Sequence, residues 1–192
     1  MTETSQSVND NFVGQVLLAM PTMSDPRFER AVIYVCAHNE DGAMGIIINK
    51  ILDSIDFREL SGQLDIPVKD TAQDVDVHFG GPVENHRGFV LHSIDYHNDE
   101  TLAVSNSVGL TATLDVLRDL AKGEGPKKYT FALGYTGWGP GQLEVELKEN
   151  AWLSVPASDN LLFEIANNDK WERAFNSIGV NLSVLSGASG HA

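Results

Sequence analysis

The densest group of residues that could do chemistry is the stretch LGYTGWGPGQLEVEL at positions 133–147, where four glycines lie within nine residues. Glycine amides at the start of a helix bind phosphate, because the helix N-terminus carries about half a positive charge. The lysine of a phosphate-binding loop does not follow Gly141, and Gln142 stands where a dinucleotide fingerprint has its third glycine. Glu144 would also repel an anion. We therefore interpret these glycines as residues that let the chain turn, with Trp138 packed over the corner.

A second glycine pair, Gly80 and Gly81, follows an expected strand in HFGGPV and precedes Pro82. Paired glycine amides can form an oxyanion hole, but that chemistry needs a nucleophile in a Gly-x-Ser-x-Gly turn, which the chain lacks. The pair therefore predicts a sharp turn at the end of a strand. One alternative stays open: an enzyme whose glycine corner binds a phosphate-bearing or acyl substrate, with His78 or Glu144 as general base.

The histidines and the cysteine form no metal-binding or nucleophile pattern. Asp95, His97 and Asp99 would share one face of an extended chain, but no spacing typical of zinc occurs, so we predict no metal site. Cys36 lies in an apolar strand without a flanking base, and burial would raise its pKa and make it unreactive. The thiol would be reactive only if the strand end near His38 were open. We predict no cofactor.

Charge limits the partners of this chain. The 192 residues carry 13 basic and 27 acidic side chains, which gives a net charge of −14. A protein that binds the nucleic-acid backbone needs clustered cations, and the Lys127-Lys128 pair, Arg27 and Arg30 form no stripe. We therefore predict no direct binding of DNA or RNA.

The N-terminal sequence and the apolar runs predict a cytoplasmic protein that does not enter a membrane. MTETSQSVND lacks the basic start and apolar centre of a secretory signal. No apolar run reaches the ~18 residues of a membrane helix. The single cysteine also rules out a disulfide within the chain.

Apolar runs bounded by turn residues predict the strands that position these groups. Helical spacing predicts helices over residues 56–64, 111–126 and 169–179, one that starts near Pro140, and a segment capped by Ser158. We expect a single compact α+β domain with a mixed sheet and about four flanking helices, in which the second and third strands form a central hairpin. The expected strands cover residues 14–20, 31–37, 43–49, 88–94, 101–106, 127–135 and 151–157, and residues 74–83 are expected as a half-exposed strand that runs into the Gly-Gly-Pro turn.

The chain resembles the YqgE/AlgH family of bacterial proteins in segments that run in the expected order from about residue 12 to 187. The resemblance implies a compact α+β fold with a mixed, partly barrel-like sheet. It implies no reaction and no catalytic residues; some members carry the label of a transcriptional regulator, which came from genetic association. We expect one domain over residues 12–187, a mobile polar tail at 1–11 and a flexible C-terminus at 188–192. The matching segments are LLAMPTMSDPRFERAVIYV, GAMGIIINK, FGGPV, RGFVLHS, LGYTGWGPGQLEVEL, NAWLSVPA and LLF, followed by Trp171.

Together these patterns favour a protein without catalytic activity that binds a protein partner or a small ligand and affects transcription indirectly. The loops at residues 21–28, 80–82 and 135–141 each lie at the end of a strand, and we expect them to meet in a groove. Such a groove would suit a peptide, a partner surface or a small apolar ligand. The candidate residues are Met23, Phe28, Gly80, Gly81, Pro82, Tyr135, Gly137, Trp138, Gly141 and Gln142.

Overall fold

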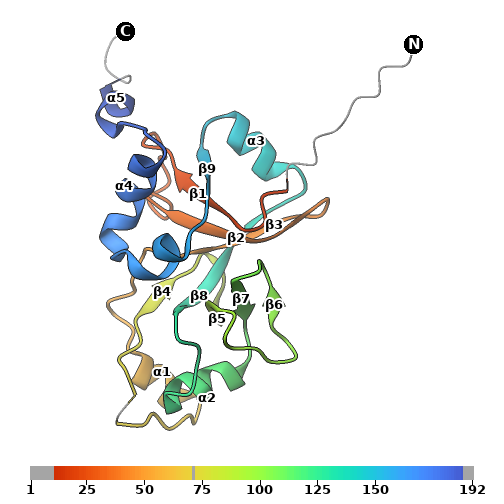
Figure 1. The fold of residues 1–192 in the computed structure, drawn as a ribbon, viewed down its shortest axis with the longest axis vertical. Helices are drawn as coiled ribbons and strands as arrows, with labels where there is room; N and C mark the ends of the chain where they lie inside the picture. Colours follow the sequence, from red (N-terminus) through yellow and green to blue (C-terminus); the bar gives the residue numbers. More distant parts are fainter. Residues whose placement is uncertain (1–10, 71, 188–192) are drawn as a thin grey trace, which may run out of the picture.

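One curled sheet of nine strands organises the part of the chain that the structure describes (Figure 1). The computed structural model describes residues 11–70 and 72–187, which form a single compact domain. The predicted C-terminal segment at 188–192, and the predicted tail apart from residue 11, lie outside these ranges. The strands are β1 (Gln15–Ala19), β2 (Val32–Asn39), β3 (Gly42–Ile47), β4 (Val77–Phe79), β5 (Val83–Ser93), β6 (Leu102–Ala103), β7 (Val108–Thr111), β8 (Tyr129–Trp138) and β9 (Trp152–Pro156).

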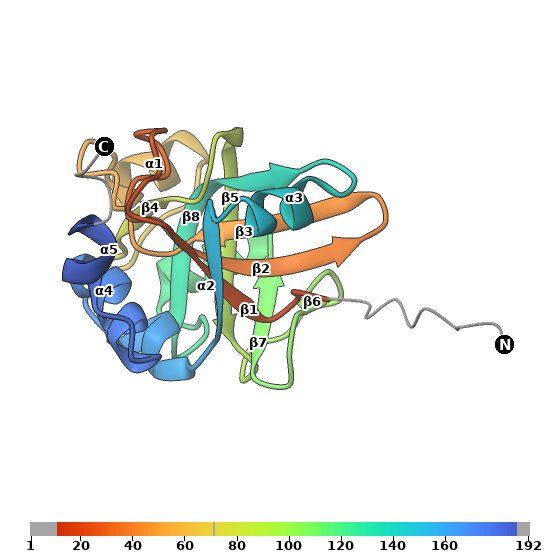
Figure 2. The ribbon, with the colours of Figure 1, turned by 90° about the horizontal axis from the view of Figure 1, so that it is seen from above.

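The long strand β8 joins the two halves of this sheet, which Figure 2 shows from above. The strand order is β6-β7-β5-β8-β3-β2-β1-β9, and β4 lies beside β8 outside this path. The first part of β8 pairs with β5, and residues 136–138 pair with β3. Gly134, with a φ of 74°, bends the strand between its two partners. Among the described strand pairs only β4–β8 is parallel, so the sheet is mixed, as the sequence predicts.

The end of β8 differs from the prediction. We expected a strand that ends at Tyr135 and a helix that starts near Pro140. The strand continues to Trp138, and the helix begins at Gln142. The prediction was wrong here because Gly134 bends the strand without ending it, and a bend of this kind leaves no signal that separates it from a turn.

The central hairpin is confirmed, since β2 and β3 pair antiparallel. β2 lies between β1 and β3, and most of its residues are buried. A bulge at Cys36 shifts the register between Val35 and Ala37. The apolar residues on both faces of these strands therefore reflect central positions with cover on each side.

The strands of the other half were predicted less well. The strand expected over residues 101–106 is reduced to β6, and β7 was not predicted. Ser105 Oγ accepts the backbone N–H groups of Ser107 and Val108 at 3.3 and 3.1 Å, which closes a turn between the two strands. Residues 74–83, expected as a strand that runs into a Gly-Gly-Pro turn, contain only the short strand β4, and Val83 already belongs to β5.

Helices cover the sheet on several sides. In Figure 1, α1 and α2 lie at the bottom beneath β5 and β8, and α4 and α5 lie on the left beside β1. The segment capped by Ser158 is a π-helical turn, and α5 was not predicted. None of the described helices combines the length and apolar composition that a bilayer crossing requires. The helices are α1 (Phe57–Gln63), α2 (Leu114–Lys122), α3 (Gln142–Lys148), η1 (Asn160–Glu164), α4 (Asn167–Ser177) and α5 (Leu182–Gly187).

Three hydrophobic clusters fill the space between the sheet and these helices. The first packs α4, including Trp171, and η1 against one face of β1, β2 and β3 and extends to β5 and β7. The second lies under α1 and α2, where the rings of Phe57 and Phe131 meet edge to face at 5.4 Å. The third covers the opposite face of β1, β2 and β3 and contains Trp138 and Trp152. Both faces of the central strands are thus removed from water.

Candidate functional site

The glycine pair at positions 80 and 81 packs against the bend in β8. A Cβ atom at Gly81 would lie 2.1 Å from the carbonyl carbon of Tyr135, and one at Gly134 would lie 2.3 Å from the carbonyl oxygen of Gly81. The Gly80 amide donates to the carbonyl oxygen of Leu133 at 2.9 Å. These glycines therefore allow two backbone segments to approach closely, and the Gly80 amide is used within the sheet.

The polar groups of the glycine corner after β8 bond to one another. Glu146 Oε2 accepts the indole N–H of Trp138 at 2.9 Å and that of Trp152 at 2.7 Å. Gln142 Nε2 donates to the other oxygen of this carboxylate at 2.8 Å. The Gly139 amide, which a bound phosphate would need, donates to Gln142 Oε1 at 2.9 Å. This arrangement favours a structural turn at the corner.

Of the ten predicted groove residues, the structure brings Met23, Phe28 and Trp138 into one hydrophobic cluster. The rings of Phe28 and Trp138 both meet Trp152 edge to face, at centroid distances of 5.8 and 6.0 Å. Tyr135 packs in a different cluster. Among the remaining candidates, Gly80 and Gly81 are buried, Pro82 is half-buried, and Gly137, Gly141 and Gln142 are exposed.

The two candidate bases of the enzymatic alternative each have a partner of their own. His78 is buried, with its Nδ1 atom 3.1 Å from the carbonyl oxygen of Phe131. Glu144 Oε1 lies 2.7 Å from His38 Nε2. Burial lowers the pKa of His78, and a hydrogen bond from its own backbone amide lowers the pKa of Glu144. Each group is therefore a weaker base near neutral pH than in its ordinary state.

The other reactive candidates are also engaged within the fold. Cys36 is 2% exposed, and burial raises its pKa to about 12. Asp95 accepts hydrogen bonds from the Ser93 hydroxyl and from the Lys127 amide. Within residues 11–70 and 72–187, no three His, Cys, Asp or Glu side chains are placed to hold a metal ion.

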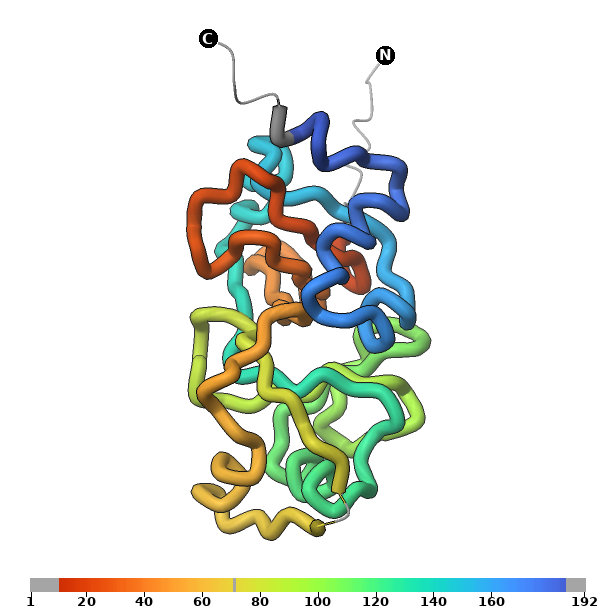
Figure 3. The backbone as a smooth tube through the Cα atoms, turned by 90° about the vertical axis from the view of Figure 1, so that its left-hand side faces the viewer, coloured from red at the N-terminus to blue at the C-terminus, as the bar shows by residue number. Residues whose placement is uncertain are grey.

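A cleft that the sequence did not reveal lies where three segments meet, and its volume is about 770 Å³. Its walls come from the loop at residues 26–30, the segment at residues 49–53 and the start of α4, with Phe79 between them. Figure 3 shows the loop before β2, drawn red, and α4, drawn blue, near the orange segment that follows β3. One loop of the predicted groove therefore contributes to this cleft.

Asn49 ties two of these walls together. Its Nδ2 atom donates to the carbonyl oxygen of Arg30 and its Oδ1 atom accepts the Val32 amide, both at 2.9 Å. Arg30 has a φ of 53°, a left-handed conformation that is uncommon for a residue with a Cβ atom. The Phe79 amide donates to the carbonyl oxygen of Lys50 at 2.8 Å, which fixes the second wall along β4. The walls are thus held by the Asn49 side chain and by one backbone hydrogen bond.

The third wall has a buried lysine behind it. Lys170 is 3% exposed, and its Nζ atom donates to the carbonyl oxygens of Ile48 and Leu162 at 3.2 and 3.0 Å. It also donates to Oδ1 of Asn167, which lines the cleft, at 3.2 Å. Burial lowers the pKa of Lys170 to about 8. The Lys170 ammonium therefore lies behind the cleft wall and contacts it through the hydrogen bond to Asn167.

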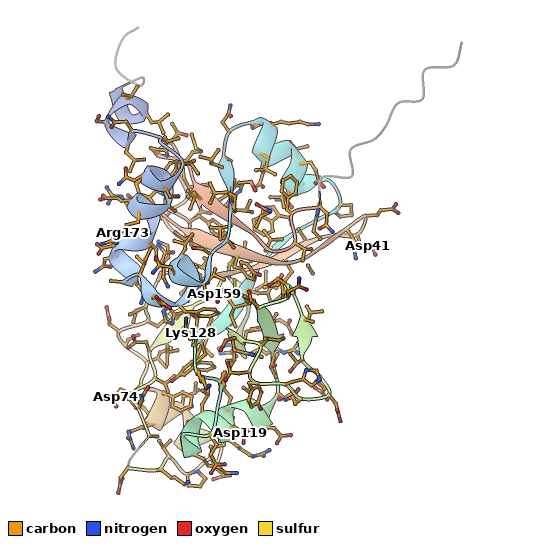
Figure 4. The ribbon with its side chains drawn as sticks, viewed as in Figure 1. Asp41, Asp74, Asp119, Lys128, Asp159 and Arg173 are labelled. Carbon is orange, nitrogen blue, oxygen red and sulfur yellow. The ribbon has the colours of Figure 1, made fainter. Side chains whose placement is uncertain are left out.

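Cations gather at this cleft although the chain is acidic. Arg27, Arg30 and Lys50 line it together with Glu29 and Asp53 on a chain of net charge −14. Arg27 is paired with Asp25 at 2.7 Å, so Arg30 and Lys50 are the lining cations without a close acidic partner among the described residues. The acidic groups lie mostly elsewhere, and Figure 4 labels several of them on separate elements. Cationic groups that line a concave site and lack a close acidic partner attract anions.

These features place the protein in a class of small α+β proteins built on a curled, half-barrel sheet. In this chain the start of α4 forms one wall of a cleft beside that sheet. Comparison with known proteins identifies the family within this class. The family model described as AlgH-like matches residues 16–183. The chain therefore belongs to the AlgH-like family, which confirms the resemblance noted in its sequence.

Individual relatives agree with this assignment. The chain is 55% identical to a UPF0301 protein from Rhodospirillum rubrum over 93% of each chain. It is 52% identical to a UPF0301 protein from Afipia carboxidovorans, over 93% of this chain and 89% of that one. The solution structure of the AlgH protein from Pseudomonas aeruginosa is 39% identical and matches with a TM-score of 0.78 over the whole of both chains. A crystal structure of a Corynebacterium diphtheriae protein, 21% identical, shares the fold with a TM-score of 0.72 over 93% of each chain.

Proposed function

We propose that this protein binds a small ligand without catalysis, in the cleft between the loop at residues 26–30, the segment at residues 49–53 and the start of α4. The observation that carries the proposal is the cleft itself. Its volume of about 770 Å³ falls within the range of roughly 300–1,000 Å³ that small-molecule sites occupy. Hydrogen bonds through Asn49 hold two of its walls, so the site exists before a ligand arrives.

The same proposal assigns the predicted groove residues a supporting role. Phe28 and Met23 anchor the loop before β2 in the cluster that contains Trp138. This anchoring holds Arg27 and Arg30, which flank Phe28 in the sequence, at the cleft. For the remaining residues of the predicted groove, binding to a partner protein stays a prediction.

We further propose a cytoplasmic regulatory role that acts through a protein partner rather than through DNA. Many of the cations are already paired with acids, as in Arg118–Asp115 at 2.7 Å and Lys128–Glu164 at 2.5 Å. A net charge of −14 also opposes approach to a phosphate backbone. Occupancy of the cleft would then control the partner.

A native mass spectrum of protein freshly purified from its host tests the binding proposal. We expect a bound small molecule in the wild type. Asn168→Trp, which places an indole at the cleft, should lose it, whereas Asn176→Trp, an equally exposed position on the same helix, should keep it. The proposal would be overturned if the purified protein carries no bound molecule and shows no thermal shift with a set of metabolites. It would also be overturned if Asn168→Trp retains the ligand.

A further inference from the structure

We propose that the cleft takes a phosphomonoester of a small hydroxylated molecule, and that Lys50 and Arg30 bind its phosphate. This inference rests on the proposed function, because it names the chemical class of ligand for the same cleft. The two cations come from different walls, the segment after β3 and the loop before β2. A ligand group that bonds to both must therefore present several acceptor oxygens.

Lys50 is a cation without a hydrogen-bond acceptor. It is half-buried at the cleft, and no oxygen of the described part of the chain accepts a hydrogen bond from its ammonium. Burial lowers the pKa of Lys50, and the negative charge of Glu29 opposes this shift in part. Three N–H donors in a half-buried place favour an anionic acceptor from outside the protein.

Arg30 is positioned so that the edge of its guanidinium is available. The group lies over the ring of Trp171, with the guanidinium carbon 5.2 Å from the ring centroid. It forms a loose ion pair with Glu172 at 3.6 Å, which is longer than a short hydrogen bond, and both side chains are more than half exposed. Stacking occupies the plane of a guanidinium and leaves its N–H fork free for a phosphate.

The backbone of Arg30 is held in a conformation that costs free energy. A φ of 53° is strained for arginine, and the hydrogen bond from Asn49 to the Arg30 carbonyl oxygen maintains it. Strained backbone that its surroundings fix in this way is common at binding sites. The same conformation sets where the arginine side chain leaves the loop.

The other residues that line the cleft are the reason for proposing a ligand with a single phosphate group. Phe79 and Leu52 supply apolar wall for the organic part of the ligand. Glu29 and Asp53 also line the cleft, and they would repel a second phosphate while accepting hydrogen bonds from hydroxyl groups. A polyphosphate is therefore a poorer fit than one phosphate on a hydroxylated body.

Titration of the full-length protein tests this inference, with glucose 6-phosphate and adenosine monophosphate as probes. Glucose and adenosine serve as the dephosphorylated counterparts. Amide NMR shifts locate the contact, and calorimetry measures affinity. We expect the phosphorylated member of at least one pair to bind at least about tenfold more tightly than its counterpart, to shift the amides of residues 49–53, and to lose affinity as salt is added.

Charge variants assign the contact to the two cations. Lys50→Gln and Arg30→Gln should each weaken binding about tenfold or more, and Glu29→Gln should strengthen it. Arg87→Gln is the matched control for Arg30, because Arg87 lies over Phe89 at 5.2 Å with Glu84 at 3.7 Å. Lys69→Gln is the control for Lys50, since Lys69 pairs with Glu124 at 3.5 Å outside the cleft.

The outcomes separate this inference from the proposed function. Equal binding of phosphorylated and dephosphorylated probes, or wild-type affinity in Lys50→Gln and Arg30→Gln, would overturn the phosphate assignment. A host ligand without phosphate, lost in Asn168→Trp, would leave the proposed function intact and remove this inference. Binding of no small molecule would remove both. If Arg30→Gln does not fold, the opposite signs expected for Lys50→Gln and Glu29→Gln still decide the question.

Discussion

Trp138 donates its indole N–H to Glu146 Oε2 at 2.9 Å, and this bond ties the last residue of β8 to α3. The same oxygen accepts the indole N–H of Trp152 at 2.7 Å, which adds β9 to the contact. Both tryptophans are almost fully buried, at 6% and 4% exposure. A single carboxylate oxygen thus satisfies two largely buried donors.

Replacement of Glu146 by alanine should lower the free energy of unfolding by about 2–6 kcal/mol, because it orphans two buried indole donors and each costs about 1–3 kcal/mol. Urea unfolding followed by tryptophan fluorescence measures the change. Glu149→Ala is the control, since Glu149 is exposed at the end of the same helix. Equal stability of the two variants would show that the indole bonds contribute nothing.

Two glycines of the corner should respond differently to alanine. Gly134→Ala should destabilise the protein by about 3 kcal/mol or more, because φ is 74° and the new Cβ atom would lie 2.3 Å from the Gly81 carbonyl oxygen. Gly139→Ala should cost no more than about 1 kcal/mol, since its nearest neighbour, Gln142 Oε1, is 3.8 Å away. Thermal unfolding compares the two. A tolerated Gly134→Ala would contradict the close approach of the two backbone segments.

The sequence predicted the helices and strands that are set by residue patterns within a single segment. The β2–β3 hairpin follows from two apolar runs around a polar turn, and α2 follows from its leucine spacing and from Gly123, which ends it in a left-handed conformation. β7 was missed because its place in the sheet depends mainly on its pairing with residues 90–93 of β5, which come before β6 in the chain. The length of β8 was mispredicted because Gly134 bends a strand there.

The cleft was beyond sequence reasoning for a related reason. Arg30, Lys50 and Asn167 are far apart in the chain and come together only when β3, β4 and α4 are assembled. Arg27 and Arg30 were recognised as isolated cations, and nothing in their spacing indicates a shared site with Lys50. A weak signal was present in Asn49, a polar residue directly after an apolar strand, because such residues often fasten neighbouring loops.

Cys36 should be almost unreactive in the folded protein. With a pKa of about 12, its thiolate fraction at pH 8 is about 10⁻⁴, so alkylation by iodoacetamide should be about a thousandfold slower than that of a free cysteine. Mass spectrometry follows the reaction. Asp41→Cys adds an exposed thiol at the tip of the β2–β3 hairpin, where Figure 4 labels Asp41, and serves as an internal control. Equal labelling of both thiols in the native state would contradict the burial of Cys36.

The buried ammonium of Lys170 should make stability depend on pH. Because burial lowers the folded-state pKa to about 8, the unfolded chain binds more protons at Lys170 between pH 8 and the ordinary lysine value near 10.5. The free energy of unfolding should therefore rise with pH across this window, by up to about 3 kcal/mol from this group. Below pH 8 the contribution is constant.

Comparison of the wild type with Lys170→Met isolates this effect, because the other titrating groups cancel in the difference. Urea unfolding at pH 7, 8, 9 and 10 should show the stability of the wild type rising relative to that of the variant, whatever the absolute cost of leaving the Ile48 and Leu162 carbonyl oxygens without a donor. Lys128→Met is the flat control: Glu164 raises the pKa of Lys128 above its ordinary value near 10.5, so the contribution of Lys128 stays constant from pH 7 to 10 and is lost only at higher pH. A wild type minus Lys170→Met difference that stays flat from pH 7 to 10 would mean that Lys170 keeps the pKa of an exposed lysine, and that its three acceptors offset the burial.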